Sequence, residues 1–183
     1  MGASSHRWPD HRRRARISTI LALCLIVSKA ALAQGAQAGS AALERLTALD
    51  GQWQAGTSNF RSTLHFQRSP AGGAVRAWNE VTGADGRTAF YEGTYFWDPG
   101  RMALRFVTVT SSGELHEGEV YWRGGMLWHD ARVSGSSLTS YRSSLRLVDG
   151  TLEYRAVYGT LAPDAEVLAA TPLVYRRVSP PPA

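Results

Sequence analysis

The fold is decided by residues 87–123, which read RTAFYEGTYFWDPGRMALRFVTVTSSGELHEGEVYWR. This stretch holds three apolar-rich runs, separated by Asp98-Pro99-Gly100 and Ser111-Ser112-Gly113, and these residue types reverse the direction of a chain. Each run has the length of a strand, and nothing of helix length separates the runs to make a parallel crossover. The stretch therefore predicts an antiparallel meander.

The same rhythm of short runs and Gly/Pro/Asp/Ser turns continues on both sides of this stretch. Ten strands are predicted, near Gln52–Thr57, Phe60–Arg68, Ala74–Thr82, Arg87–Trp97, Met102–Thr110, Leu115–Arg123, Met126–Val133, Leu138–Val148, Thr151–Tyr158 and Leu173–Val178. Strands at a spacing of about ten residues with tight turns are typical of an all-β barrel or sandwich. We expect a single antiparallel up-and-down barrel in residues 40–179.

Two helical segments interrupt this pattern. Leucines at 43, 46 and 49 share one face of a short helix predicted over Ser40–Leu49, with Gly51 just past its end. Ala162–Ala170 is predicted as a longer loop or one helical turn. The strand Arg87–Trp97 carries rings on both faces, so it needs a second cover, and the first helix is the candidate.

Residues 1–33 are interpreted as a secretory signal peptide. Five arginines between Arg7 and Arg16 precede the apolar run Ile17–Val27, and Ala31-Leu32-Ala33 then supplies a cleavage signal. The apolar run is about half the ~20 residues that a bilayer span needs, so no permanent membrane anchor is expected. The alternative is a lipoprotein signal at Cys24. The expected location is periplasmic or secreted, with residues 34–39 as a flexible tether and 180–183 as a Pro-rich tail.

Removal of this segment changes the charge of the protein. The full chain has 20 Lys and Arg residues and 15 Asp and Glu residues. Six of the basic residues and one of the acidic residues lie in residues 1–33. The remainder carries 14 of each and no net charge, so no nucleic-acid partner is expected. Cys24, the only cysteine, also lies in the segment, which leaves no cysteine for a disulfide, a metal site or a nucleophile.

Gly51-Gln52-Trp53, directly after the predicted helix, resembles the Gly-x-Trp opening of lipocalin-like (calycin) barrels. The order of elements, ending in Tyr175-Arg176-Arg177, is similar across the rest of the chain. The resemblance implies structural roles for Gly51 and Trp53: the Trp closes one end of the barrel, and Arg176 or Arg177 packs across it.

Within that superfamily the chain is most similar to bacterial lipocalin-like domains of unknown function, and next to nitrobindin-type haem barrels. The turn Pro70–Gly73 before Trp78 and Glu80, and the segment Gly118–Trp122, carry this similarity. The haem barrels place a histidine near their last strands as the iron ligand, whereas this sequence has no histidine after His129. The expected cofactor is therefore none, with haem as the alternative.

No catalytic motif is recognised, so a non-catalytic protein is expected. A zinc site formed by His116, Glu117 and His129 is conceivable, but no metal-binding spacing supports it. The serines lack a nucleophile elbow. Carboxylates in the strands are expected to face solvent or to pair with arginines.

The aromatic residues are the stronger signal, because rings with a few polar groups line ligand cavities. The predicted ligand-binding residues are Tyr91, Tyr95, Trp97, Arg142, Tyr154 and Arg155. An inward arginine, Arg142 or Arg155, would hold a ligand carboxylate or pair with a glutamate such as Glu92 or Glu153. The expected partner is a small apolar molecule or lipid. The alternatives are an enzymatic or haem-binding barrel and a filled structural barrel.

Overall fold

The computed structural model describes residue 35 and residues 37–179. The described residues 38–179 belong to one compact unit. The signal peptide expected in residues 1–33 and the tail expected at residues 180–183 lie outside the described residues.

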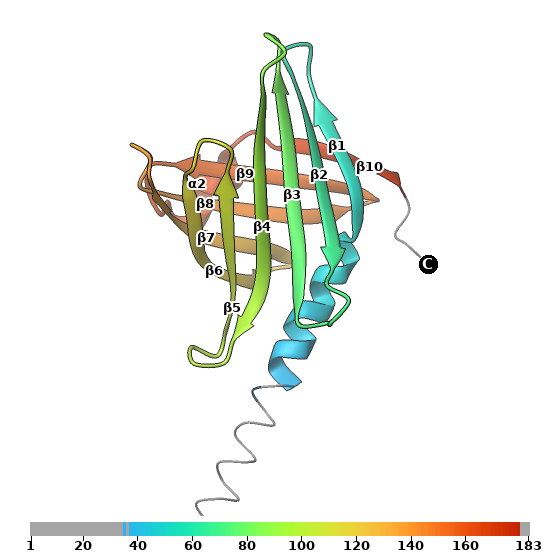
Figure 1. The fold of residues 1–183 in the computed structure, drawn as a ribbon, viewed down its shortest axis with the longest axis vertical. Helices are drawn as coiled ribbons and strands as arrows, with labels where there is room; N and C mark the ends of the chain where they lie inside the picture. The colour runs from blue at the N-terminus through green and yellow to red at the C-terminus, as the bar shows by residue number, and fades with distance from the viewer. Residues whose placement is uncertain (1–34, 36, 180–183) are drawn as a thin grey trace, which may run out of the picture. The chain divides into compact units, whose positions relative to one another are not determined.

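Ten antiparallel strands close into one barrel, which confirms the predicted all-β up-and-down architecture (Figure 1). The strands are β1 (Gly51–Gly56), β2 (Phe60–Arg68), β3 (Ala74–Gly83), β4 (Thr88–Asp98), β5 (Ala103–Thr110), β6 (Leu115–Arg123), β7 (Met126–Ser134), β8 (Ser140–Val148), β9 (Thr151–Tyr158) and β10 (Leu173–Ser179). Each strand pairs with the next along the chain, and β10 returns to pair with β1. The steep strands β2–β4 cross in front of β8 and β9 in Figure 1.

Side chains alternate between the two faces of each strand. In β2, Leu64 and Phe66 face the interior, while His65 lies on the outer face and stacks on Trp78 at 4.5 Å between ring centroids. In β4, Tyr95 is buried in the core, whereas Phe90 is half exposed on the other face. The period of two residues along each strand therefore separates the interior of the barrel from its surface.

A helix closes one end of the barrel. Residues 37–46 are α-helical and continue into the 3-10 helix η1 (Thr47–Leu49), and their leucines enter the main core at Leu43, Leu46 and Leu49. The helix begins before Ser40, so the tether expected over residues 34–39 is helical at residues 37–39. Within the described residues, no helix is long and apolar enough to cross a bilayer.

Trp53 lies behind this helix and has no exposed surface. Its indole N–H donates a hydrogen bond of 2.7 Å to the carbonyl oxygen of Leu49. The guanidinium of Arg177 lies 4.2 Å from the centre of the Trp53 ring and donates to the carbonyl oxygens of Ala48 and Asp50. Of the two candidate arginines, Arg177 is the one that packs over Trp53, and Arg176 is exposed.

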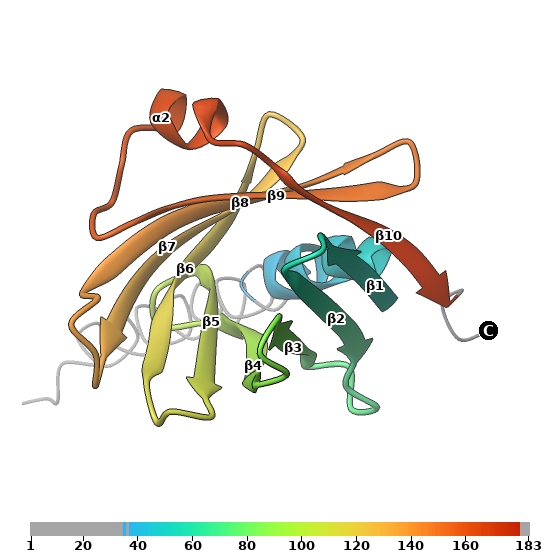
Figure 2. The same ribbon diagram turned by 90° about the horizontal axis from the view of Figure 1, so that it is seen from above.

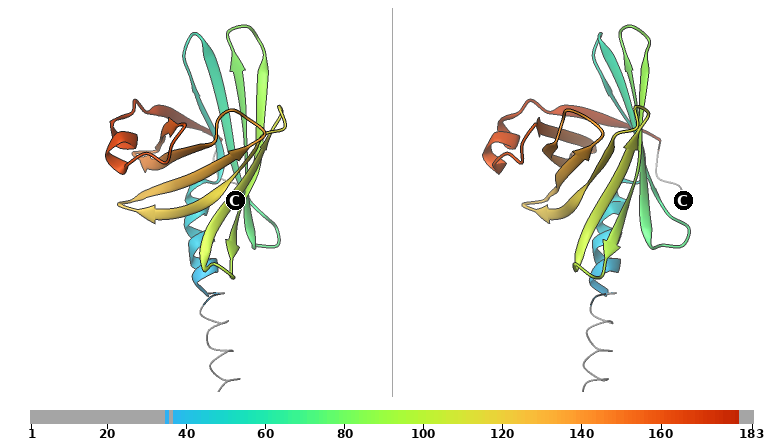
Figure 3. Two further views of the ribbon diagram at one scale, coloured as in Figure 1. Left: turned by 90° about the vertical axis from the view of Figure 1, so that its left-hand side faces the viewer. Right: turned by 60° about the vertical axis from the view of Figure 1, so that its left-hand side comes forward.

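The segment between β9 and β10, residues 159–172, lies on the outside of the barrel, and we call it the strap. It contains the short helix α2 (Asp164–Ala169), where the sequence predicted a loop or one helical turn. α2 contacts β8 and β9, and Figures 2 and 3 show it on the outer side of these strands. Beneath the strap, Trp128, Ala162 and Val167 form a second, smaller core.

Candidate functional site

The barrel contains a cavity of about 450 Å³ at the end opposite the helix. This end carries the β1–β2 and β3–β4 turns at the top of Figure 3. Nine of the lining residues are phenylalanine or tyrosine: Phe60, Phe66, Tyr91, Tyr95, Phe106, Tyr141, Tyr154, Tyr158 and Tyr175. The main polar lining residues are Ser62, Asn79, Thr108, Glu114, His116, His129 and Ser143.

One group of rings lies near the open end of the cavity, and we call it the upper tier. His116 contacts Tyr91 and Tyr141 edge to face, with centroid distances of 6.2 and 5.7 Å, and Tyr141 contacts Tyr158 at 5.6 Å. Tyr158 is 58% exposed, whereas His116 and Tyr141 are buried. The mouth of the cavity is therefore framed by rings whose polar atoms are still close to water.

The lower tier surrounds the ring of His129. Phe106 and Tyr95 contact this imidazole edge to face at 5.4 and 5.7 Å, and Tyr95 also packs on Phe66. The Tyr95 hydroxyl and the His129 Nε2 atom lie 2.9 Å apart and share a hydrogen bond. Burial lowers the pKa of His129 to about 4 and raises the pKa of Tyr95, so both side chains are neutral at neutral pH.

Two further sets of polar side chains on the cavity wall form hydrogen bonds within each set. The Ser62 hydroxyl donates to the Asn79 side-chain oxygen at 2.8 Å and lies 2.9 Å from the Tyr175 hydroxyl. The Tyr154 and Tyr158 hydroxyls lie 3.3 Å apart. Burial raises the pKa of Tyr154 and of Tyr175. These pairs place hydrogen-bonding atoms in an apolar wall without adding charge.

Glu114 contributes a carboxylate at the mouth. It follows the β5–β6 turn, and its side chain is 26% exposed. Hydrogen bonds with Ser136 and His116 lower the pKa of Glu114, and the His116 Nε2 atom lies 3.4 Å from the carboxylate. Glu114 is therefore ionised at neutral pH.

The predicted ligand-binding residues separate into two groups. Tyr91, Tyr95 and Tyr154 line the cavity. Trp97, on the same face of β4, lies at the closed end, where it lines a separate hollow of about 430 Å³ between the helix and β5 and β6. Six residues of extended chain span about 20 Å, so Tyr91 and Trp97 lie at opposite ends of one strand.

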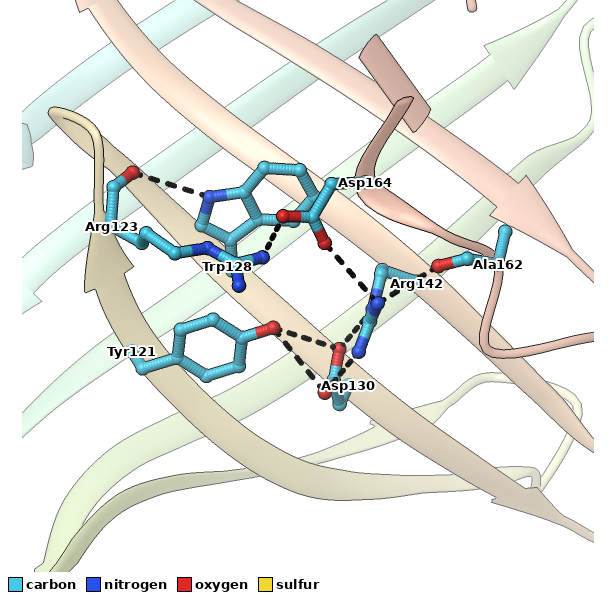
Figure 4. A network of polar contacts seen from close by, with 7 residues as sticks. All are labelled: Tyr121, Arg123, Trp128, Asp130, Arg142, Ala162 and Asp164. Carbon is cyan, nitrogen blue, oxygen red and sulfur yellow. Dashed lines mark hydrogen bonds and ion pairs between the residues drawn. The ribbon is translucent and has the colours of Figure 1, made fainter. Parts of the chain in front are cut away.

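The prediction of an inward arginine is wrong for Arg142. Arg142 lies on the outer face of β8, between the inward Tyr141 and Ser143. Figure 4 shows its guanidinium bonded through Nε and Nη2 to the two carboxylate oxygens of Asp130, at 2.5 and 2.7 Å. Its Nη1 atom donates to the Ala162 carbonyl oxygen at 2.9 Å and lies 3.3 Å from Asp164. Arg142 therefore ties the strap to the barrel.

Arg155 also lies outside the cavity. In β9 the inward positions are occupied by Tyr154 and Tyr158, so Arg155 faces outward beside Glu153, with which it forms an ion pair of 2.8 Å. The expected pairing with Glu153 is thus present, but on the outer face. Glu92 pairs with Arg76 at 2.6 Å on an exposed part of β3 and β4.

The sequence suggests a role for His116 and His129 only as zinc ligands with Glu117. The structure separates this set, because both histidines line the cavity while Glu117 is exposed on the other face of β6. Among the described residues, no group of three or more His, Cys, Asp or Glu side chains is arranged to hold a metal ion. His129 is two residues from Leu127 and Ala131 and four from Val133, so it shares the face of these apolar residues. That spacing is the signal that could have assigned it to the interior.

Comparison with models of known protein families gives no match, and comparison with curated proteins gives none either.

Proposed function

We propose that this protein is an exported, lipocalin-like barrel that binds a small, mainly apolar ligand and performs no catalysis. The observation that carries the proposal is the cavity of about 450 Å³, lined mainly by rings, at the end of the barrel that the helix leaves uncovered. Ligand sites of about 300–1,000 Å³ with apolar walls and a few placed polar groups are typical of proteins.

The polar groups of the cavity support binding rather than chemistry. The Tyr95–His129 pair is neutral and buried. Among the described residues that line the cavity, no carboxylate forms a hydrogen bond with this pair. A general base needs a pKa near the working pH, whereas burial moves the pKa of His129 down to about 4.

A neutral dye tests the proposal. Nile red, which brightens in apolar surroundings, should bind the purified protein with micromolar affinity. Val81→Trp places a large ring in the cavity wall and should weaken binding by about tenfold or more. Glu80→Trp, at the next position and exposed on the outer face, is the matched control and should leave binding unchanged. Equal binding by both variants would place the dye elsewhere and contradict the proposal.

Export is tested separately by N-terminal sequencing of protein recovered from outside the cytoplasm. The proposal expects a first residue of Gln34, after cleavage at Ala31-Leu32-Ala33. A lipid-modified Cys24 as the first residue would favour the lipoprotein alternative.

A haem held by a histidine, as in the barrels that the sequence resembles, would use His116 or His129 among the described residues of the cavity. The Nε2 atom of His129 is engaged by Tyr95, and the Nε2 atom of His116 lies 3.4 Å from Glu114, so ligation of iron through Nε2 would require one of these contacts to open. A Soret band in the purified protein would favour haem over the apolar ligand. Mass spectrometry of the same sample would identify a co-purified lipid.

A further inference from the structure

The charge of the cavity wall is unusual for a site that would take an anionic lipid. No lysine or arginine lines the cavity in the part of the chain that the structure describes, and Glu114 is its only carboxylate. A buried carboxylate on a ligand needs a cation or several strong donors to offset its lost hydration. The wall provides no such cation.

The nearest candidates for that role are already engaged outside the barrel. Arg142 is held by Asp130 and by the strap, and Arg155 by Glu153, both on the outer faces of their strands. Neither side chain can enter the cavity without reversing the alternation of its strand.

The remaining ionisable groups inside the cavity do not supply positive charge either. His129 is 4% exposed and its Nδ1 atom has no hydrogen-bond partner among the described residues, so protonation would leave a bare charged N–H in an apolar site. The low pKa of His129, about 4, follows from this burial. At the mouth, the His116 Nε2 atom lies 3.4 Å from the Glu114 carboxylate, so this nitrogen already faces an anion of the protein.

We propose that the cavity selects an uncharged ligand that carries a hydroxyl group, and that Glu114 at the mouth disfavours carboxylates. This inference rests on the proposed binding function. The Ser62 hydroxyl already donates its proton to Asn79, so it retains a lone pair that can accept a hydrogen bond from a ligand hydroxyl. The paired hydroxyls of Tyr95 and Tyr154 also retain lone pairs that a ligand hydroxyl can use. The rings around them provide the apolar contact.

Three probes of matched shape test the inference: 2-naphthalenemethanol, 2-naphthoate and 2-naphthylmethylammonium. Their affinities are measured by isothermal titration calorimetry at pH 8, where an ordinary histidine is neutral. The alcohol should bind at least about tenfold more tightly than the carboxylate, because burial of an unpaired charge is costly. It should also bind more tightly than the ammonium ion.

Glu114→Gln removes the charge and keeps the shape of the side chain. It should tighten binding of 2-naphthoate by about three- to tenfold relative to binding of the alcohol. Glu117→Gln is the matched control, since it makes the same change three residues along β6 on the outer face, and it should alter neither affinity. Thermal melting of both variants checks that the barrel remains folded.

The outcomes separate the inference from the function on which it rests. Binding of 2-naphthoate as tight as that of the alcohol would overturn the selection for uncharged ligands while supporting a binding cavity. Tightest binding of the ammonium ion would also overturn it and would point to organic cations. Absence of binding by all three probes and by Nile red would overturn the binding function and the inference together.

Discussion

Trp53 links the helix, β1 and β10 through three kinds of contact. Its ring is fully buried, its indole N–H bonds to Leu49, and its face carries the guanidinium of Arg177. Trp53→Ala should lower the free energy of unfolding by about 3–5 kcal/mol, the usual range for truncation of a large core side chain. Urea denaturation followed by circular dichroism measures this change.

Trp78→Ala is the matched control for Trp53→Ala. Trp78 lies on the outer face of the barrel and stacks on His65, so its removal opens no cavity in the core. Its loss should cost about 1 kcal/mol. Equal losses for the two variants would mean that Trp53 does not hold the closed end together.

His129 should make the stability of the fold depend on pH. Burial lowers its pKa to about 4 in the folded protein, while the unfolded chain has a pKa near 6.5. Between these values the unfolded chain takes up a proton that the folded protein does not bind. The free energy of unfolding should therefore be complete above about pH 6.5 and fall by up to about 3 kcal/mol as the pH drops to 4.

His129→Gln should remove most of this dependence, as measured by urea midpoints at pH 7 and pH 4.5. Asp98 and Glu114, whose pKa values are lowered in the fold, lose their contributions at still lower pH in both proteins. His65→Gln, on the outer face, should leave most of the pH dependence of the free energy of unfolding in place. The same slope in the wild type and in His129→Gln would show that His129 is not the responsible group.

At the scale of elements, the strap is held by a network of charges that Figure 4 shows on the outer faces of β6–β8. Asp164 receives bonds from Arg123 and Arg142, and Asp130 receives the paired bonds of Arg142 and a longer contact with the Tyr121 hydroxyl. The Arg142 and Asp130 side chains are 18% and 24% exposed, so the pair is partly shielded from water. Such a pair contributes more than an exposed ion pair.

Arg142→Ala should therefore free the strap and destabilise the protein by about 1–3 kcal/mol, since Asp130 keeps its charge and loses its partner. Hydrogen exchange should become faster in residues 159–172 and stay unchanged in β2–β4. Arg146→Ala is the control, because Arg146 lies exposed on the same face of β8. Faster exchange throughout the barrel would show that Arg142 supports the whole fold rather than the strap.

Gly118 shows how closely two strands approach at one point of β6. A Cβ atom there would lie 1.9 Å from the Asp130 carbonyl oxygen of β7, so an alanine requires the backbone to move. Gly118→Ala should cost about 1–3 kcal/mol in thermal or urea denaturation. Gly73→Ala, in a turn with open space around it, should change stability by less than about 0.5 kcal/mol. If Gly118→Ala left the stability unchanged, the backbones of β6 and β7 would be able to move apart at little cost in free energy.

For the whole molecule, the strand pattern could be predicted because turn residues and alternation are local properties of the chain. No predicted strand end differs from the observed one by more than two residues. The inward direction of Tyr91, Tyr95 and Tyr154 follows from the same alternation once the face of each strand is known.

The positions of Arg142 and Arg155 could not be predicted in this way, since alternation separates two faces without saying which one is inside. The strap covers part of the outer surface, so a partly buried arginine does not identify the interior. Trp97 shares its face with Tyr91 but lies at the closed end, because the sequence does not show how far along a strand the cavity extends.

The pairing of β1 with β10 has a consequence for synthesis. These strands come from the two ends of the domain, and contacts between distant segments form late in folding because a long loop must close first. A nascent chain that still lacks β10 presents the unpaired edges of β1 and β9, and such edges recruit other strands. The barrel can thus be completed only after β10 has been synthesised. A chain truncated before Leu173 should aggregate rather than fold.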